Sequence, residues 1–148
     1  MADPFQDVDA AGEDFIQIFA DSMDERQSDP TMERIVAEYL GQLEINDDSI
    51  LIEVGAGAGA VSRRIAKFAQ PAQVIGYDPS VGFVEQAKAR AAGYTNLSFA
   101  VADGAALPLA DESVDNVVFH TVLTHVPQPD LLIAEARRVL KPKGRLVI

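Results

Sequence analysis

A glycine-rich segment with an acidic residue at its start is the feature of this sequence that most directly suggests ligand chemistry. Residues 53–59 read EVGAGAG and follow a short apolar run. Glycine lets the backbone make tight turns and approach a ligand closely, and the free N–H groups of a following helix would face the same place. The segment therefore predicts a nucleotide-type ligand site. The backbone of Gly55, Ala56, Gly57 and Gly59 would form the wall of this site.

Glycine spacing alone leaves the ligand open. Gly55, Gly57 and Ala60 also satisfy the dinucleotide fingerprint, in which a pyrophosphate lies at the helix N-terminus. A loop that needs small residues only for tight packing is a further alternative. Glu53 favours a ligand with an ammonium group over a dinucleotide, because its carboxylate would repel a pyrophosphate but would suit an ammonium group.

Two more carboxylates follow apolar runs further along the chain. Asp78 comes 23 residues after Gly55, at an offset where a carboxylate can accept both hydroxyls of a ribose. Its alternative role is to cap a helix that begins at Pro79. Asp103 can accept a hydrogen bond from an adenine amino group, and its alternative role is that of a turn residue before Gly104.

From residue 50 onward, short apolar runs alternate with helical patterns, which is typical of repeated βα units and a parallel sheet. We expect strands at residues 50–54, 73–77, 97–102, 115–120 and 145–148. We expect helices at residues 60–69, 81–92 and 129–140. Residues 46–148 form the predicted Rossmann-like domain of the α/β class, a parallel sheet flanked by helices.

Residues 1–45 are predicted to be a helical segment that packs on this domain. The first dozen residues are small and acidic, and we expect them to be frayed. Apolar residues then recur at helical spacing over residues 13–23 and again from Met32 to Leu43. Asp29 followed by Pro30 predicts the N-cap and first position of the second helix.

The composition limits the possible functions. The chain has no cysteine and two histidines, so it offers no thiolate or His-rich metal site, and we expect no metal. A net charge of −11 disfavours nucleic acid as a partner. No basic leader and no long uncharged apolar run is present, so we expect a cytoplasmic protein without a membrane span.

Several motifs in order make the chain from residue 50 resemble class I S-adenosylmethionine-dependent methyltransferases, especially the ubiquinone and menaquinone biosynthesis type. The motifs are EVGAGAG (53–59), GYDPS (76–80), VADGAALPL (101–109), DESVD (111–115), LTHV (123–126) and RVLKPKG (138–144). Each motif is weak alone, but their order and spacing together are specific. The resemblance implies the cofactor S-adenosylmethionine and methyl transfer to a small-molecule acceptor.

The resemblance also implies roles for single residues. Glu53 and the Gly55 backbone would hold the methionine amino group, Asp78 beside Pro79 would hold the ribose, and Asp103 with the Gly104 backbone would hold the adenine. Carboxylates at these three places suit a cofactor that has no phosphate.

His120 and Thr121 end the fourth predicted strand, beside the expected position of the sulfonium methyl group. His120 is the one catalytic candidate: it could line the cleft, act as a general base, or be an ordinary hydrogen-bonded histidine. For His125 we expect capping or packing. Asp115 begins its strand at the far edge of the sheet, so we interpret it as structural.

The chain departs from the family pattern at a few places. Lys143 replaces a common glycine and Val114 a common aromatic residue, which affects a turn and a packing contact. The family's sheet resembles a seven-stranded one, whereas this chain ends at Ile148 inside the fifth strand. We therefore expect an incomplete domain, with residues 145–148 as an exposed edge strand that allows self-association.

Two other functions are considered. One is a fragment that binds the cofactor without turnover. The other is an NAD-dependent oxidoreductase, which would be expected to carry a Tyr-x-x-x-Lys pair. The fourth residue after each tyrosine is not a lysine: Leu43 after Tyr39, Val81 after Tyr77 and Ser98 after Tyr94.

Overall fold

A five-stranded parallel sheet forms the centre of the molecule. The computed structural model describes residues 3–148. The strands are β1 (Ile50–Val54), β2 (Gln73–Asp78), β3 (Leu97–Val101), β4 (Val114–Phe119) and β5 (Leu140–Val147). Their order in the sheet is β3-β2-β1-β4-β5, and every neighbouring pair is parallel. The order reverses beside β1, so β1 and β4 flank the switch point where ligands bind in open α/β sheets.

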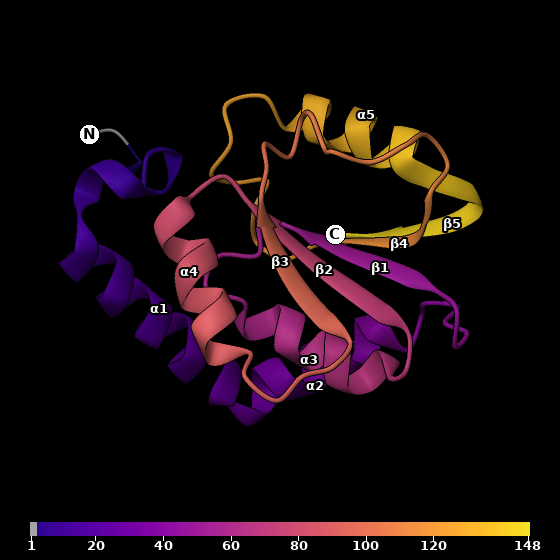
Figure 1. The fold of residues 1–148 in the computed structure, drawn as a ribbon, viewed down its shortest axis with the longest axis horizontal. Coiled ribbons are helices and arrows are strands. Elements are labelled where there is room, and N and C mark those ends of the chain that lie inside the picture. The colour runs from indigo at the N-terminus through magenta and orange to yellow at the C-terminus, as the bar shows by residue number, and fades with distance from the viewer. Residues whose placement is uncertain (1–2) are drawn as a thin grey trace.

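Helices cover both faces of this sheet. They are α1 (Glu13–Ser28), α2 (Pro30–Leu40), α3 (Ala60–Ala69), α4 (Val81–Arg90) and α5 (Pro129–Val139). Figure 1 shows α2, α3 and α4 on one side of the strands and α5 on the other, with α1 alongside α4. This arrangement confirms the predicted Rossmann-like α/β fold with helices before the first strand.

The helix starts follow from their sequences. Asp29 Oδ1 accepts a hydrogen bond from the Thr31 N–H at 2.7 Å, and Pro30 occupies the first turn, as predicted. At the start of α4, Ser80 Oγ accepts from the Phe83 N–H at 3.0 Å. These caps satisfy N–H groups that a helix leaves without a partner in its first turn.

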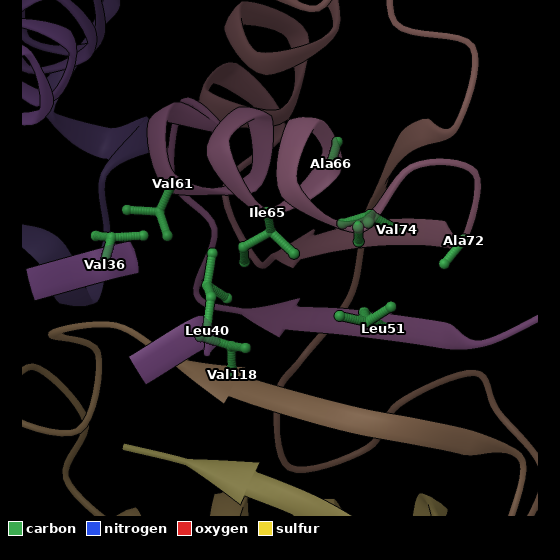
Figure 2. Close-up of a cluster of buried hydrophobic side chains, with 10 residues drawn as sticks. Val36, Leu40, Leu51, Val61, Ile65, Ala66, Ala72, Val74 and Val118 are labelled. Atoms are coloured by element: carbon green, nitrogen blue, oxygen red, sulfur yellow. The ribbon is translucent and has the colours of Figure 1, made fainter. Parts of the chain in front are cut away.

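The core on the α3 side joins α2 and α3 to the sheet. Figure 2 shows Val36 and Leu40 reaching this cluster from α2, while Val61 and Ile65 reach it from α3. Leu51, Val74 and Val118 supply the strand side of the cluster. Because these side chains are almost fully buried, they fix the position of β1 and of the loop that follows it.

A second cluster lies under α5. Leu132, Ala136 and Val139 of that helix pack on apolar residues of β1 and β4, and Leu107 joins them from the long β3–β4 connection. The two clusters bury β1 on both faces, which is the usual environment of a central parallel strand.

The expectation of a frayed N-terminus was wrong for the described part of that segment. It forms two short 3-10 helices, Pro4–Gln6 and Asp9–Ala11. The Asp9 carboxylate accepts hydrogen bonds from Ser80 Oγ at 2.6 Å, from Val81 N–H at 2.8 Å and from Gly82 N–H at 3.0 Å. Asp9 thus caps α4 from a distance in sequence, which the local composition could not reveal.

The end of the chain also differs in detail from the expectation. Helix α5 ends at Val139, and β5 begins at once at Leu140, well before the predicted residue 145. Its early part is irregular, with a register shift against β4 and Lys143 at φ 70°. Among residues 3–148, β5 pairs only with β4, so its other side is an open edge, and Ile148 is exposed.

Within residues 3–148, none of the helices is both long and apolar enough to span a membrane.

Candidate cofactor site

The carboxyl ends of the strands open into a cavity of about 560 Å³, a size typical of small-molecule sites. A smaller pocket of about 80 Å³ adjoins it beneath the glycine loop. Most of the predicted site residues line the main cavity: Gly55, Gly57, Asp78, Pro79, Asp103, Gly104, His120 and Thr121. Glu53 and Ala56 line the smaller pocket, whereas Gly59 lines neither.

The three glycines are required by backbone shape and by protein packing. Gly55, Gly57 and Gly59 all have positive φ, between 53° and 77°. A Cβ at Gly55 would stand 2.3 Å from Val122, and one at Gly59 would stand 2.5 Å from Phe99. Gly59 is therefore a helix–strand packing position, while Gly55 and Gly57 shape the wall of the cavity.

The N–H groups of the loop distinguish between the two classes of cofactor. The Gly55 and Ala56 N–H groups both donate to the Tyr77 carbonyl, at 2.8 and 2.9 Å. The Gly57 N–H donates to Asp78, and the Gly59 N–H to the Ala56 carbonyl. A pyrophosphate needs such groups free to cradle it. This loop therefore fits a cofactor that is held by carboxylates rather than by backbone amides.

Asp78 ends β2 and is fixed by two backbone donors. Its Oδ2 accepts from the Gly57 N–H at 2.8 Å, and its Oδ1 accepts from the Ser80 N–H at 3.0 Å. Each carboxylate oxygen can accept a second hydrogen bond. Burial raises the pKa of Asp78, against these two donors. The side chain can thus cap the local backbone and still accept donors from the cavity.

Glu53 is the most deeply buried acid of the site, with 2% of the residue exposed. Ser62 Oγ, from the first turn of α3, donates to its Oε2. Burial raises the pKa of Glu53 to about 8, and the hydrogen bond from Ser62 offsets only part of this effect. No lysine or arginine of residues 3–148 forms a salt bridge with Glu53. A buried carboxyl without a cation partner is suited to receive one from a ligand.

Asp103 follows β3 and turns the chain into the long connection to β4. Its Oδ1 accepts from the Ala105 N–H at 2.8 Å, so the turn role considered from sequence is real, and the side chain still lines the cavity. The connection is held from α5: Glu135 Oε1 accepts from the Leu107 N–H at 2.7 Å, and Arg138 donates to the Leu109 carbonyl at 2.9 Å. These contacts tie the segment that follows Asp103 to helix α5.

His120 lies just after β4, and both of its ring nitrogens face protein groups. Tyr39 OH is 3.1 Å from Nδ1, and Gln27 Nε2 is 3.5 Å from Nε2. Burial lowers the pKa of His120, with a smaller contribution from the charge of Arg26. The neutral imidazole is thus tied to two N-terminal helices, which favours a wall of the cleft over a general base. Thr121, next to it, is exposed and has φ 59°.

The other two polar residues considered from sequence have structural partners. His125 Nδ1 lies 2.8 Å from Asp3 Oδ2, and its ring packs against Phe5 at a centroid distance of 4.7 Å. Asp115 lies at the amino edge of the sheet, where its Oδ2 accepts from the Ile50 N–H at 2.8 Å and from Lys141 Nζ at 2.9 Å.

Sequence reasoning missed the contribution of the N-terminal residues to the cavity. Phe5, Phe19, Met23 and Arg26 all line it. The apolar stripe of residues 13–23 indicated a helix that packs on something, but nothing local indicated that it packs across the carboxyl ends of the strands. A hydrophobic cluster that joins Ile16 and Ala20 to Ala58 and Phe83 holds it there.

Comparison with known proteins identifies the family of the domain that carries this site. A family model described as a methyltransferase domain matches residues 52–148, a range that begins inside β1 and includes the other four strands in full. The chain belongs to this methyltransferase family. Its cofactor is S-adenosylmethionine, and the predicted class I family is thereby confirmed.

Curated relatives of this methyltransferase chain have different names. It is 38% identical over 98 residues to a demethylmenaquinone methyltransferase of Clavibacter sepedonicus, a match that covers 66% of this chain and 39% of that protein. It is 36% identical over 97 residues to a malonyl-[acyl-carrier protein] O-methyltransferase of Hahella chejuensis, with 66% of this chain and 34% of that protein covered. The methyltransferase chain thus spans well under half the length of these relatives.

Solved structures share the fold. The YcgJ protein of Bacillus subtilis superimposes with a TM-score of 0.71 at 26% identity, covering 77% of this chain and 49% of that one. An S-adenosylmethionine-dependent methyltransferase of Aquifex aeolicus reaches 0.69 at 21% identity, covering 82% and 67%, and this likeness concerns the fold alone.

Proposed function

We propose that the chain transfers a methyl group from S-adenosylmethionine to a small-molecule acceptor. The observation that carries the proposal is the cavity at the carboxyl edge of the sheet. It joins buried carboxylates that lack cation partners to a glycine loop in which the N–H groups of Gly55, Ala56, Gly57 and Gly59 donate to protein oxygens. This combination suits a cofactor with an ammonium group, a ribose and an adenine but no phosphate.

The ammonium group, the ribose and the adenine of the cofactor each have a matching carboxylate. Glu53 would hold the methionine ammonium group beside Gly55 and Ala56, and Asp78 would accept the ribose hydroxyls beside Pro79 and Gly57. Asp103 and the Gly104 backbone would bind the adenine. The order of these residues along the edge follows the strand order, because Glu53, Asp78 and Asp103 lie in or directly after β1, β2 and β3.

The chain's contribution to the reaction is mainly positional. The bound cofactor supplies an electrophilic sulfonium methyl group. The residues of the cavity hold donor and acceptor in line, an effect worth up to ~7–11 kcal/mol in favourable systems. His120 and Thr121 would form the wall beside the transferred methyl group, and His120 is too engaged with Tyr39 and Gln27 to be the main proton acceptor.

The acceptor is proposed to be a small molecule, in a cytoplasmic setting. The names of the relatives refer to a menaquinone precursor and to a malonyl group on a carrier protein, so they support a range of acceptors rather than one. The net charge of −11 opposes a nucleic-acid acceptor.

A transfer assay with cofactor labelled at the methyl group tests the proposal. Incubation with a metabolite extract should move label into small molecules, and the Asp78→Ala variant should transfer less label at the same cofactor concentration. Tight cofactor binding without any transfer would instead support a cofactor-binding fragment. Binding of NAD without binding of S-adenosylmethionine would contradict the cofactor assignment itself.

A further inference from the structure

His125 lines the main cavity with a ring that has only one nitrogen bound to protein. Its Nδ1 lies 2.8 Å from Asp3 Oδ2, and its Nε2 forms no hydrogen bond within residues 3–148. The side chain of His125 is 39% exposed. His120 is different, because each of its ring nitrogens faces a protein group and burial lowers its pKa. Of the two histidines of the chain, His125 is therefore the one with a nitrogen available to a ligand.

A turn after β4 fixes the position of His125 relative to the glycine loop. The His125 N–H donates to the Val122 carbonyl at 3.0 Å and closes this turn. Val122 packs against the loop, since a Cβ at Gly55 would stand 2.3 Å from Val122 Cγ2. The imidazole is thus carried by a segment that rests on the glycine loop, and it lines the same cavity as Asp78 and Asp103.

The Asp3 carboxylate orients this imidazole. Its Oδ1 accepts from the Phe5 N–H at 2.9 Å, so the side chain is fixed while its Oδ2 meets His125. The Phe5 ring lies against His125 and packs edge-on against Phe19 of α1, at a centroid distance of 5.0 Å. The hydrogen bond with His125 lowers the pKa of Asp3, which is therefore ionised at neutral pH. A carboxylate at Nδ1 keeps the ring proton on that nitrogen and leaves a lone pair on Nε2.

We propose that Asp3 and His125 form a dyad that removes a proton from the methyl acceptor, with His125 Nε2 as the general base and Asp3 as a positioning residue. The proposal rests on the proposed function and narrows the acceptor to a molecule whose reacting atom carries a proton, as a hydroxyl group does. It also gives a role to a residue outside the family match, which begins at residue 52.

The proton and the charge balance in this step. As the reacting atom of the acceptor bonds to the methyl carbon, its proton moves to His125 Nε2. The electron pair of the broken carbon–sulfur bond remains on sulfur. The positive charge of the sulfonium thus ends on an imidazolium, which the Asp3 carboxylate stabilises through Nδ1.

The charged and titratable groups near the base determine the expected pH dependence. Asp3 contacts His125 directly, and the other such groups that line the main cavity are Arg26, Asp78, Asp103 and His120. At saturating cofactor, ionisation of the acids that bind it does not limit the rate. Only a neutral imidazole accepts a proton, so the rate of transfer should fall about tenfold for each pH unit once His125 is protonated.

Nitrogen NMR of the free chain tests the dyad without any acceptor. His120→Gln and His125→Gln variants assign the two imidazole signals. At pH 8 the wild-type His125 should carry its proton on Nδ1, and Asp3→Asn should lower the population of this tautomer. Asp14→Asn is the matched control, because Asp14 is exposed in the first turn of α1 and its replacement removes the same charge. A wild-type His125 with its proton on Nε2 would overturn the proposal.

Transfer of labelled methyl groups into a metabolite extract tests the role in catalysis. His125→Gln should reduce the rate at saturating cofactor by about a hundredfold or more and flatten the pH profile, with unchanged affinity for S-adenosylhomocysteine. Asp3→Asn should also slow transfer, and Asp3→Glu should restore part of the rate. Unchanged transfer by a folded His125→Gln variant, or by Asp3→Asn, would overturn the dyad. Failure of the wild-type chain to transfer any label would instead contradict the proposed function.

Discussion

At the amino edge of the sheet Asp115 is held by Lys141 and by a backbone N–H, whereas at the carboxyl edge Glu53 and Asp78 have no cation partner within residues 3–148. Asp115 is also the more exposed of these acids. The amino edge thus contains an ordinary structural ion pair. The carboxyl edge keeps acids under conditions that raise their pKa values.

This difference shows which edge is adapted to a ligand. Burial of a carboxyl group without a cation disfavours its ionised form and destabilises the free protein. An ammonium group or ribose hydroxyls from a ligand would supply the missing partners.

The largest effect is expected for Asp78→Ala. The substitution removes the proposed ribose acceptor, and it also leaves the Gly57 and Ser80 N–H groups without their acceptor. We expect cofactor affinity to fall by about 1–3 kcal/mol and the free energy of unfolding to fall by a similar amount. Calorimetry and denaturant melts measure the two effects. A stable variant with unchanged affinity would show that Asp78 is neither ligand acceptor nor essential cap.

Glu53→Gln should separate stability from binding. The folded pKa of about 8 lies above the ordinary value of 4.5, so the folded chain binds more protons than the unfolded chain between these values. The stability contribution of protonated Glu53 is therefore complete below about pH 4.5 and is lost as the pH rises toward 8. Glutamine keeps the shape without this penalty.

We thus expect Glu53→Gln to raise the free energy of unfolding at pH 8 by on the order of 1–3 kcal/mol while weakening cofactor binding. The stability difference should close near pH 4.5. Urea melts of both proteins at several pH values measure it. A variant that is less stable than wild type at pH 8 would mean that Glu53 is ionised and satisfied in the free protein.

A weaker effect is expected at the open edge of β5. Its outer N–H and C=O groups pair with no strand among the described residues, and Ile148 is exposed. Such an edge favours pairing between chains. Sedimentation velocity should show concentration-dependent self-association, reduced by Val147→Lys. Sedimentation as a monomer at all concentrations would count against a role of this edge.

The smallest effect is expected for Asp115→Asn. Asparagine keeps an oxygen for the Ile50 N–H and loses only a partly exposed ion pair with Lys141, so stability should fall by less than about 1 kcal/mol. Cofactor affinity should not change. A large loss of affinity in a calorimetric titration would mean that the cofactor binds at the amino edge of the sheet and not at the carboxyl edge.

The sequence predicted the sheet well because its signals were local. The apolar runs of β1 and β2, the Asp29 cap and the glycine loop each depend on neighbouring residues. It predicted the N-terminus and β5 less well. Asp9 is ordered by the start of α4, some 70 residues away, and the irregular start of β5 depends on its pairing with β4.

The site, like the fold, was predictable where its signals were local in the sequence. The glycines and the acids at strand ends could be identified because parallel strands bring their carboxyl ends together. Arg26 and Gln27 could not, because their positions depend on how α1 crosses the sheet. The engagement of His120 by Tyr39 and Gln27 likewise depends on tertiary packing.

The buried Glu53, protonated in the free chain, is proposed to receive the cofactor's ammonium group. Calorimetric titration of S-adenosylhomocysteine at pH 7, in buffers that differ in ionisation enthalpy, measures it most directly through the number of protons released. Because the pKa of Glu53 is about 8 in the free chain, the account predicts that wild type releases close to one proton per ligand bound and that Glu53→Gln releases none. Tight binding without proton release, or equal release from both proteins, would contradict it.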